Sequence, residues 1–171
     1  MSTADAIFDI LRRYTDTVFF VPGGGAAHLV DSLGRSKLRR VSALHEQGAA
    51  FMACGYAMAT GKLGVCLVTT GPGAVNAIAG CAAAWMDSIP VLFISGQANT
   101  WSLIGDTGLR VRGVQEVDIV PMVAPITKIV TRPTHGKAAV GSIRSMVMVC
   151  LEGRPGPGWI DIPLDVQAEE V

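Results

Sequence analysis

The sequence predicts an α/β fold: a three-layer, doubly wound arrangement in which a parallel sheet of about six strands carries helices on both faces. Two features lead to this prediction. Short, continuously apolar segments, which are typical of strands buried on both sides, alternate with longer segments of helical periodicity. Several of the apolar segments also end in glycine-rich turns, which are common where a strand leads into a helix. We expect residues 1–171 to form one domain.

The first part of the chain follows this alternation. Residues 3–14 have apolar side chains at helical spacing, and Ser2 or Thr3 can cap the first turn. Residues 17–21 (TVFFV) predict a short apolar strand, which a proline and three glycines end. The next helix is expected at residues 26–33.

The middle of the chain repeats the pattern. A β-rich segment at residues 40–44 leads into a long run of Ala, Gly, Met and aromatic residues at 46–61, which predicts a buried helix. The apolar segment GVCLVT at residues 64–69 predicts a buried strand. The following helix and strand are expected at residues 74–86 and 90–95.

A long loop interrupts the alternation before its last elements. Residues 96–113 are rich in Gly, Asn and Thr, and loops of this length are usually functional or mobile. A short helix at residues 116–122, a strand at 126–130, a helix at 135–151 and a strand at 158–162 complete the expected fold.

The composition argues against several classes of protein. Half of the residues are apolar and only 16% are charged, yet no uninterrupted apolar stretch has membrane-spanning length, and the N-terminal segment lacks the layout of a secretory signal. A formal net charge of zero gives no reason to expect binding to nucleic acid or to an anionic membrane. The four cysteines lie in apolar segments without metal-ligand spacing, which favours a reducing, cytoplasmic location. The apolar excess predicts surface covered in an oligomer.

Three strand-to-helix turns form the candidate binding site, because ligands of such sheets bind at the carboxyl ends of the strands. Residues 22–25 (PGGG) and 70–73 (TGPG) are glycine-rich, so backbone can approach a ligand closely. The third turn carries Glu46, after which no charged residue follows until Lys62. Burying a carboxylate without a cation is costly, so Glu46 is either a functional acid in a crevice or an acid stabilised by the dipole of the helix that it begins.

Phosphate-binding and hydrolytic motifs fit less well. Residues 71–76 begin like G-x-G-x-x-G, but Asn76 stands in the last place and no acidic residue closes the following strand, as a dinucleotide site requires. The sequence contains no G-x-x-x-x-G-K-[ST], H-E-x-x-H or G-x-S-x-G motif. A flat heterocycle therefore suits the crevice better than a phosphate group.

Four segments together resemble one known family. They are VFFVPGGG, HEQGAAFMACGYAMATGKLGVCLVTTGPGAVNAIAG, AWMDSIPVLFISGQ and QEVDIVPMVAPITK, in this order over nearly the whole chain. They are similar to the N-terminal pyrimidine-binding (PYR) domain of the acetolactate synthase-like thiamine diphosphate-dependent enzymes. That resemblance implies a six-stranded parallel α/β domain, in agreement with the fold predicted above.

The resemblance implies that Glu46 is the catalytic glutamate of that family. There the acid hydrogen-bonds N1′ of the cofactor's aminopyrimidine and so helps to remove the C2 proton of the thiazolium, before that carbon attacks a 2-oxo acid. Gln115 matches a glutamine near the reacting carbon and is the second catalytic candidate. The implied cofactor-binding residues are Pro22, Gly23, Gly24, Glu46, Thr70, Pro72 and Asn76.

Structural alternatives exist for several of these residues. For Thr70, Pro72 and Asn76 the alternative is a turn that opens a helix. For Gln115 it is capping of the short helix that follows. Four further residues are interpreted as structural: Asp87, Lys128, His28 and His45.

The sequence departs from the family in two respects. Val114 stands where many acetolactate synthases have an aromatic residue, so the resemblance indicates a 2-oxo acid without identifying pyruvate. The family holds the cofactor's diphosphate through Mg²⁺ in a separate domain that carries G-D-G and a later Asn. Residues 105–108 (GDTG) are the only near match and lack that Asn, so we expect this chain to bind no metal and to be inactive alone.

Two functional hypotheses follow. In the first, the chain is a subunit or fragment of a thiamine diphosphate-dependent 2-oxo acid decarboxylase or carboligase. It then works with a separate diphosphate- and Mg²⁺-binding (PP) domain or chain, in a homo-oligomer or heterotetramer. In the second, it is a non-catalytic, regulatory paralogue or isolated domain that binds a partner without turnover. The intact set Glu46, Thr70, Asn76 and Gln115 favours the first hypothesis.

Overall fold

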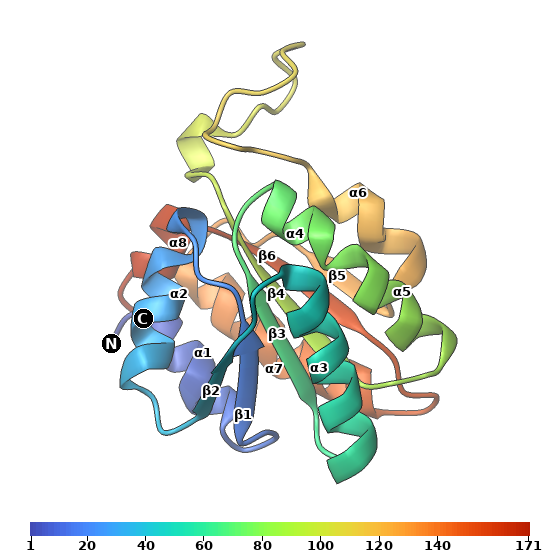
Figure 1. Ribbon diagram of the computed structural model, residues 1–171. Coiled ribbons are helices and arrows are strands. Elements are labelled where there is room, and N and C mark those ends of the chain that lie inside the picture. The colour runs from blue at the N-terminus through green and yellow to red at the C-terminus, as the bar shows by residue number, and fades with distance from the viewer.

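The computed structural model describes all residues 1–171 and contains one six-stranded sheet, in the order β2-β1-β3-β4-β6-β5 (Figure 1). Every pair of neighbouring strands is parallel, which confirms the predicted α/β fold. The strands are β1 (Thr17–Phe20), β2 (Arg39–Ser42), β3 (Gly64–Val68), β4 (Val91–Gln97), β5 (Ile129–Thr131) and β6 (Gly158–Pro163).

Eight α-helices and three short 3₁₀ turns connect the strands. The helices are α1 (Thr3–Leu11), α2 (Ala27–Arg35), α3 (Glu46–Thr60), α4 (Pro72–Asn76), α5 (Ile78–Met86), α6 (Ile119–Val123), α7 (Gly136–Leu151) and α8 (Leu164–Ala168). The 3₁₀ turns are η1 (Gly24–Ala26), η2 (Thr100–Ser102) and η3 (Ala124–Ile126). None of the helices is both long and apolar enough to cross a membrane.

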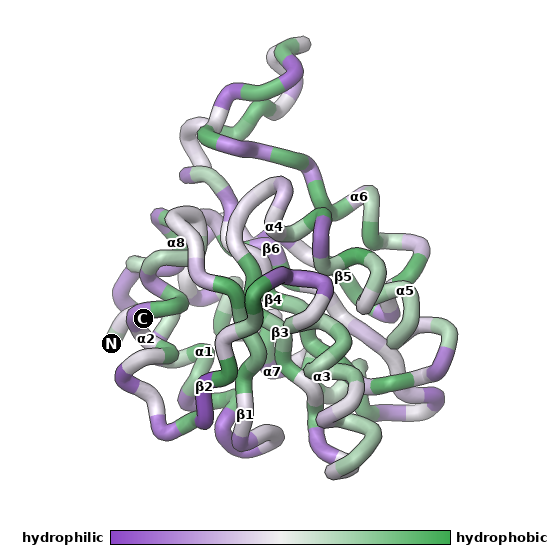
Figure 2. Tube along the Cα trace, viewed as in Figure 1, coloured by the Kyte–Doolittle hydropathy of each residue, from purple (hydrophilic) through white to green (hydrophobic).

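The sheet separates two hydrophobic cores. Helices α1, α2, α7 and α8 cover one face, and α3 to α6 cover the other (Figure 1). Strand β3 shows the alternation most plainly, because Val65 and Leu67 enter the first core while Cys66 and Val68 enter the second. The central strands are accordingly buried along their length and mostly apolar (Figure 2). Burial on both faces explains why these segments are continuously apolar in the sequence.

Side chains and a glycine fix the ends of the helices. The Ser2 hydroxyl accepts a hydrogen bond from the amide of Asp5 at 3.1 Å and caps α1, as predicted. His45 caps α3, because its Nδ1 atom accepts from the amide of Gln47 at 3.2 Å. Gly61 ends the same helix with a φ of 69°, a left-handed conformation that glycine adopts without steric cost.

Local tertiary contacts move some boundaries away from the prediction. The helix predicted at residues 74–86 is two helices, because the amide of Ala77 bonds to the carbonyl of Ala74 and tightens the turn between them. Gln115 has a left-handed backbone, so α6 begins later than predicted. Pro125 lies in η3, so β5 begins at Ile129, later in the chain than predicted. Helix α8 was not predicted.

The helix and strand around Glu46 are less buried than predicted. One face of α3 packs on the sheet, but Phe51, Met52 and Met58 on its other face are exposed. Strand β2 lies at the edge of the sheet, where Arg39 and Arg40 are exposed. This exposure leaves an apolar surface on α3.

The two ends of the chain meet beside α1 and α8 (Figure 1). The amide of Thr3 donates to the carbonyl of Glu169 at 2.7 Å, and the amide of Val171 donates to the carbonyl of Met1 at 2.9 Å. Ser2 and Glu170 form an antiparallel bridge between these bonds. The ends therefore lie together, away from the exposed face of α3.

The close packing of α3 on α5 gives a first test. Gly80→Ala should lower the free energy of unfolding by about 1–3 kcal/mol, because the new Cβ would lie 2.4 Å from Cβ of Ala50 and force the helices apart. Urea denaturation measures this change. Gly55→Ala is the matched control, since its Cβ meets nothing within 4 Å and should be neutral or stabilising by up to about 1 kcal/mol. Equal effects of the two substitutions would contradict the packing.

Candidate functional site

The winding of the chain reverses between β1 and β3. Helix α2 follows β1 on one face of the sheet, whereas α4 and α5 follow β3 on the opposite face (Figure 1). A crevice opens at the carboxyl ends of two neighbouring strands where the connections leave in opposite directions. Residues 21–25 and 69–73 border this crevice, in agreement with the predicted location of the site.

The two glycine-rich turns approach each other too closely for side chains. A Cβ atom on Gly25 would lie 1.6 Å from the Thr70 hydroxyl oxygen, and one on Gly23 would lie 2.5 Å from Cβ of Thr69. Gly96, near the end of β4, also has no room for a side chain, because its Cβ would lie 2.0 Å from the carbonyl oxygen of Gly25. Glycine at these positions therefore lets the backbone itself form the wall of the crevice.

Glu46 is the first residue of α3 and points toward the turn after β3. Its Oε2 atom accepts a hydrogen bond of 3.0 Å from the Asn76 side-chain amide on α4. Its Oε1 atom would lie 3.2 Å from a Cβ on Gly73. The carboxyl group is half-buried rather than fully enclosed. The structure thus brings two of the predicted residues, Glu46 and Asn76, into direct contact.

Three other predicted residues, Gly24, Thr70 and Gln115, line a cavity of about 220 Å³ that Glu46 and Asn76 do not line. The hydroxyl oxygen of Thr70 is buried against the backbone of Gly25 and has no hydrogen-bond partner. Gln115 has a φ of 54°, and its carbonyl oxygen would lie 1.9 Å from a Cβ on Gly71. The remaining lining residues are Gly25, Gln97, Ala98, Asn99, Ser102, Val114 and Leu164.

The other predicted site residues lie at the border of the crevice. Pro22 is exposed, Gly23 is partly buried between the two turns, and Pro72 begins α4. Val114 is exposed beside Gln115. These positions leave the mouth of the crevice open to the surface.

Among the four residues predicted to be structural, the prediction is wrong for one, His28. Lys128 donates hydrogen bonds to the carbonyls of Val149 and Glu152 at the end of α7, and Asp87 ends α5. His45 caps α3, but His28 is exposed on α2 and is not a packing residue. Exposed positions on short amphipathic helices are hard to assign from sequence alone.

A larger cavity, of about 370 Å³, lies at the opposite edge of the sheet. It is lined by Trp85, Met86, Lys128, Arg154 and Pro155, which precede strands or end helices there. It contains none of the predicted catalytic or cofactor-binding residues. The chemistry-bearing residues gather at the carboxyl edge instead.

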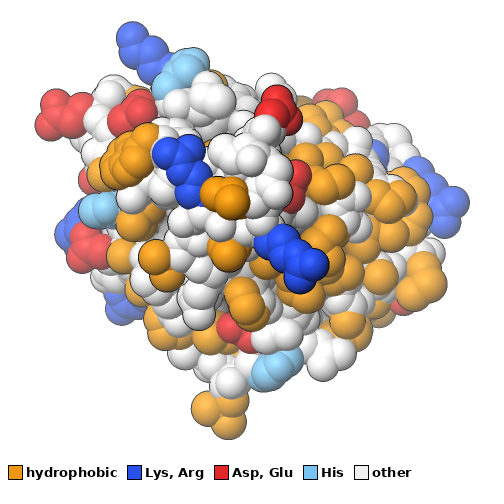
Figure 3. All heavy atoms as spheres, turned by 90° about the horizontal axis from the view of Figure 1, so that it is seen from above, with side chains coloured by type: hydrophobic (Ala, Val, Ile, Leu, Met, Phe, Trp, Pro, Cys, Tyr) orange, Lys and Arg blue, Asp and Glu red, His pale blue; other side chains and the backbone are white.

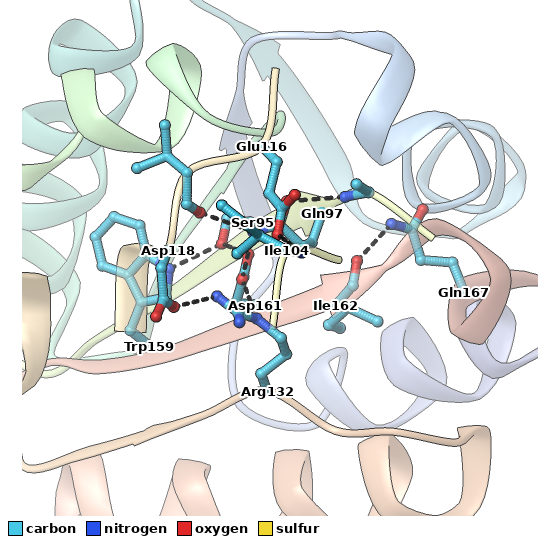
Figure 4. A network of polar contacts seen from close by, with 12 residues as sticks. Ser95, Gln97, Ile104, Glu116, Asp118, Arg132, Trp159, Asp161, Ile162 and Gln167 are labelled. Carbon is cyan, nitrogen blue, oxygen red and sulfur yellow. Dashed lines mark hydrogen bonds and ion pairs between the residues drawn. The ribbon is translucent and has the colours of Figure 1, made fainter. Parts of the chain in front are cut away.

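A buried ionic network at the carboxyl edge was not predicted (Figure 4). Asp161 in β6 accepts hydrogen bonds from the Ser95 hydroxyl at 2.6 Å, from the Gln97 amide at 2.9 Å and from Nε of Arg132 at 2.8 Å. Burial raises the pKa of Asp161 above its ordinary value, although the positive charge of Arg132 acts in the opposite direction. A lone aspartate within the apolar strand GWIDI was the signal in the sequence.

A doubly wound parallel sheet with a carboxyl group and glycine-lined turns at its switch point is typical of the α/β domains that bind ligands at the carboxyl ends of their strands. The family profile described as "Thiamine pyrophosphate enzyme, N-terminal TPP binding domain" matches residues 1–122. This match covers more than half of the chain. The chain therefore belongs to the thiamine pyrophosphate enzyme family, as its N-terminal domain, and the predicted family is confirmed.

The similar proteins are acetolactate synthases. An acetolactate synthase of Arthrospira platensis is 40% identical over 171 residues, which cover 95% of this chain and 28% of that protein. The large subunit of isozyme 2 from Escherichia coli K12 is 41% identical over 168 residues, covering 98% and 30%. The large subunit from Corynebacterium glutamicum is 39% identical over 173 residues, covering 100% and 27%. The chain thus spans less than a third of the length of these relatives.

The contact between the two turns gives a second test. Gly25→Ala should force the turn after β1 away from Thr70 and destabilise the fold by about 1–3 kcal/mol, because the new Cβ would overlap the hydroxyl. Hydrogen exchange of residues 69–73 should become faster in the same variant. Gly24→Ala is the matched control, since its Cβ meets nothing within 4 Å. Unchanged exchange in Gly25→Ala would show that the turns are not held together as described.

Proposed function

We propose that residues 1–171 form one pyrimidine-binding (PYR) domain of a thiamine diphosphate-dependent enzyme that acts on a 2-oxo acid as a decarboxylase or carboligase. In this proposal Glu46 is the acid that activates the cofactor's aminopyrimidine. The observation that carries it is the contact of Glu46 with Asn76 at the switch point, next to a glycine-lined crevice. Acetolactate synthases with about 40% identity support the same class of reaction.

The residues at the crevice fit the aminopyrimidine part of thiamine diphosphate. We assign one wall of the ring site to backbone at Pro22, Gly23 and Gly24, and Thr70 lines the cavity beside Gly24. Pro72 and Asn76 border the same space from α4. When bound, thiamine diphosphate supplies a nucleophilic thiazolium carbon for attack on the 2-oxo acid.

Glu46 would hold and transfer a proton at a ring nitrogen. The Asn76 amide donates to one carboxyl oxygen, which fixes the orientation of the group and leaves the other oxygen available. A positioned acid–base group of this kind typically contributes about a hundred- to ten-thousand-fold to the rate. Gln115 would place a neutral amide beside the reacting carbon, from the opposite wall of the cavity.

The cofactor's diphosphate and Mg²⁺ are assigned to another domain. The structure contains no group of three or more His, Cys, Asp or Glu residues that could hold a metal ion. The relatives are more than three times as long as the matched region, which leaves room for such a domain in the same or a separate chain. Residues 105–108, the near match to the G-D-G motif, are exposed in a loop.

The alternative is a regulatory or isolated domain that binds a partner without turnover. It is less well supported, because a purely structural domain has no need of a half-buried acid paired with Asn76 or of an unpaired Thr70 hydroxyl at the same crevice. Substitution of Glu46 distinguishes the two proposals, because only the first predicts a loss of catalytic rate.

Four buried cysteines support a reducing compartment such as the cytoplasm. All four are free thiols. Burial raises the pKa of Cys54 to about 11 and that of Cys150 to about 12, so these thiols stay protonated and unreactive at neutral pH. They serve as small apolar core residues.

The exposed apolar face supports association with other domains. Met58 on α3 and Met86 on α5 are each 69% exposed, and Phe51, Trp85 and Met122 are exposed nearby in the fold. Figure 3 shows hydrophobic side chains gathered on the side of α5 and α6. We assign this face to contacts in a homo-oligomer or heterotetramer, because a monomer rarely leaves so many large apolar side chains in water.

Substitution of Glu46 tests the proposed chemistry. In the complex with a diphosphate-binding domain, Glu46→Gln keeps the size of the side chain but cannot transfer a proton. It should slow exchange of the cofactor's C2 proton and turnover by about a hundred- to ten-thousand-fold, with folding nearly unchanged. Glu152→Gln, at the exposed end of α7, is the control. Exchange at the parent rate in a folded Glu46→Gln complex would remove the catalytic assignment.

The chain alone should bind thiamine diphosphate weakly and turn over no 2-oxo acid, because the proposal assigns the diphosphate and Mg²⁺ to another domain. Isothermal titration calorimetry with Mg²⁺ present measures the affinity. Submicromolar binding would be incompatible with a diphosphate site on another domain.

Self-association should be detectable for the chain alone. Sedimentation velocity over a range of concentrations should show a dimer or a higher oligomer, driven by the apolar face of α3 and α5. Met58→Lys, which puts a charge on this face, should shift the distribution toward monomer. A monomer at every concentration would argue against this role for the face.

A further inference from the structure

An exposed arm, residues 104–113, extends from the carboxyl edge of the sheet beside the candidate site. It is the segment that projects furthest from the body of the molecule in Figure 1. Its residues 105–112 are all exposed, and none of them lies in a helix or a strand. The arm therefore depends on its base for a fixed position.

One carboxylate closes the base of the arm. Oε1 of Glu116 accepts from the amide of Ile104 at 2.6 Å. Oε2 of Glu116 accepts from the amides of Gly113 at 2.9 Å and Arg112 at 3.3 Å. The side chain is only 7% exposed, so little water competes for these bonds. Both carboxylate oxygens are needed, because the first holds one end of the arm and the second holds the other.

A second set of contacts fixes the chain just after Gln115. The Gln97 amide donates to the carbonyl of Val117 at 2.9 Å, and Arg132 donates to the carboxylate of Asp118 at 2.6 Å. Both donors also bind Asp161 in the buried network (Figure 4). The chain after Gln115 is thereby fixed to β4 and β6, and the chain before it is fixed by Glu116.

The backbone of Gln115 needs such support. Its φ of 54° is a left-handed conformation that costs a residue with a side chain free energy. This conformation brings its carbonyl against Gly71, in the same turn as Thr70. A structural change at the base of the arm would therefore alter both the backbone of Gln115 and the turn after β3.

We propose that Glu116 is a positioning residue for Gln115: its carboxylate fixes the base of the arm and so holds Gln115 in the cavity opposite Thr70. The inference rests on the proposed function of Gln115, but not on the role of Glu46. Glu116 itself points into the base of the arm and does not line the cavity. It acts through Gln115.

Hydrogen exchange of the chain measures this coupling without any enzymatic assay. Glu116→Gln leaves one carbonyl oxygen for three donors. Losing a hydrogen bond to a charged group should speed exchange roughly tenfold in residues 114–118 and in the turn at 69–73. Asp106→Asn is the matched control, because it removes one carboxylate from the tip of the same arm, where it makes no hydrogen bond. Faster exchange confined to the arm would reduce Glu116 to a local loop residue and overturn the proposal.

A second variant removes the same contact from the other side. Ile104→Pro deletes the N–H that donates to Oε1 of Glu116 while leaving the carboxylate in place. It should give the same pattern of faster exchange at residues 69–73 and 114–118. If Glu116→Gln does not fold, Ile104→Pro decides alone, and unchanged exchange in those segments overturns the proposal.

A double-mutant cycle in the complete enzyme separates positioning from general stabilisation. With thiamine diphosphate, Mg²⁺ and pyruvate as the test 2-oxo acid, Glu116→Gln should lower kcat roughly tenfold, and the double variant with Gln115→Ala should be no slower than Gln115→Ala alone. Additive losses would overturn the positioning role while leaving the proposed function intact. Failure of the proposed function appears separately, as parent-rate turnover in Glu46→Gln.

Discussion

The structure depends on the close approach of two backbone turns at the carboxyl edge of the sheet. The carbonyl of Gly25 lies against Gly96, and Gly25 itself lies against Thr70, at distances that exclude any Cβ atom. This contact places the chain after β1 over the ends of β3 and β4. It also lets main chain form part of the wall of the crevice between β1 and β3. Larger residues at these positions would close the crevice and separate the strands that form it.

The buried polar groups at the carboxyl edge of the sheet differ in whether they have hydrogen-bond partners. Asp161 is fully buried but is matched by Ser95, Gln97 and Arg132, so its desolvation is offset by three hydrogen bonds, of which the one from Arg132 is also an ion pair. The buried hydroxyl of Thr70 has no hydrogen-bond partner. A satisfied network makes a rigid support, whereas an unsatisfied buried group costs free energy. The edge therefore combines a well-satisfied ionic network with one unpaired hydroxyl.

The sequence predicts the parts of the fold that depend on local pattern. Apolar segments and glycine-rich turns are enough to place the strands and to identify Glu46 at the start of α3, because these features are set by periodicity and turn chemistry. Contacts between residues that are far apart in the sequence cannot be predicted from local pattern. The left-handed backbone of Gln115 depends on Gly71, and Asp161 depends on Arg132, 29 residues earlier. The proposed roles of the site residues come from family resemblance, and the geometry adds which of them are neighbours.

The meeting of the two chain ends has a topological consequence. Met1 and Val171 are joined by a backbone hydrogen bond, and Ser2 bridges Glu170, so residues 1 and 171 lie side by side. In such a domain the order of the elements along the chain is less important than their order in the sheet. Sequence continuity and three-dimensional architecture are in this sense separable in the domain.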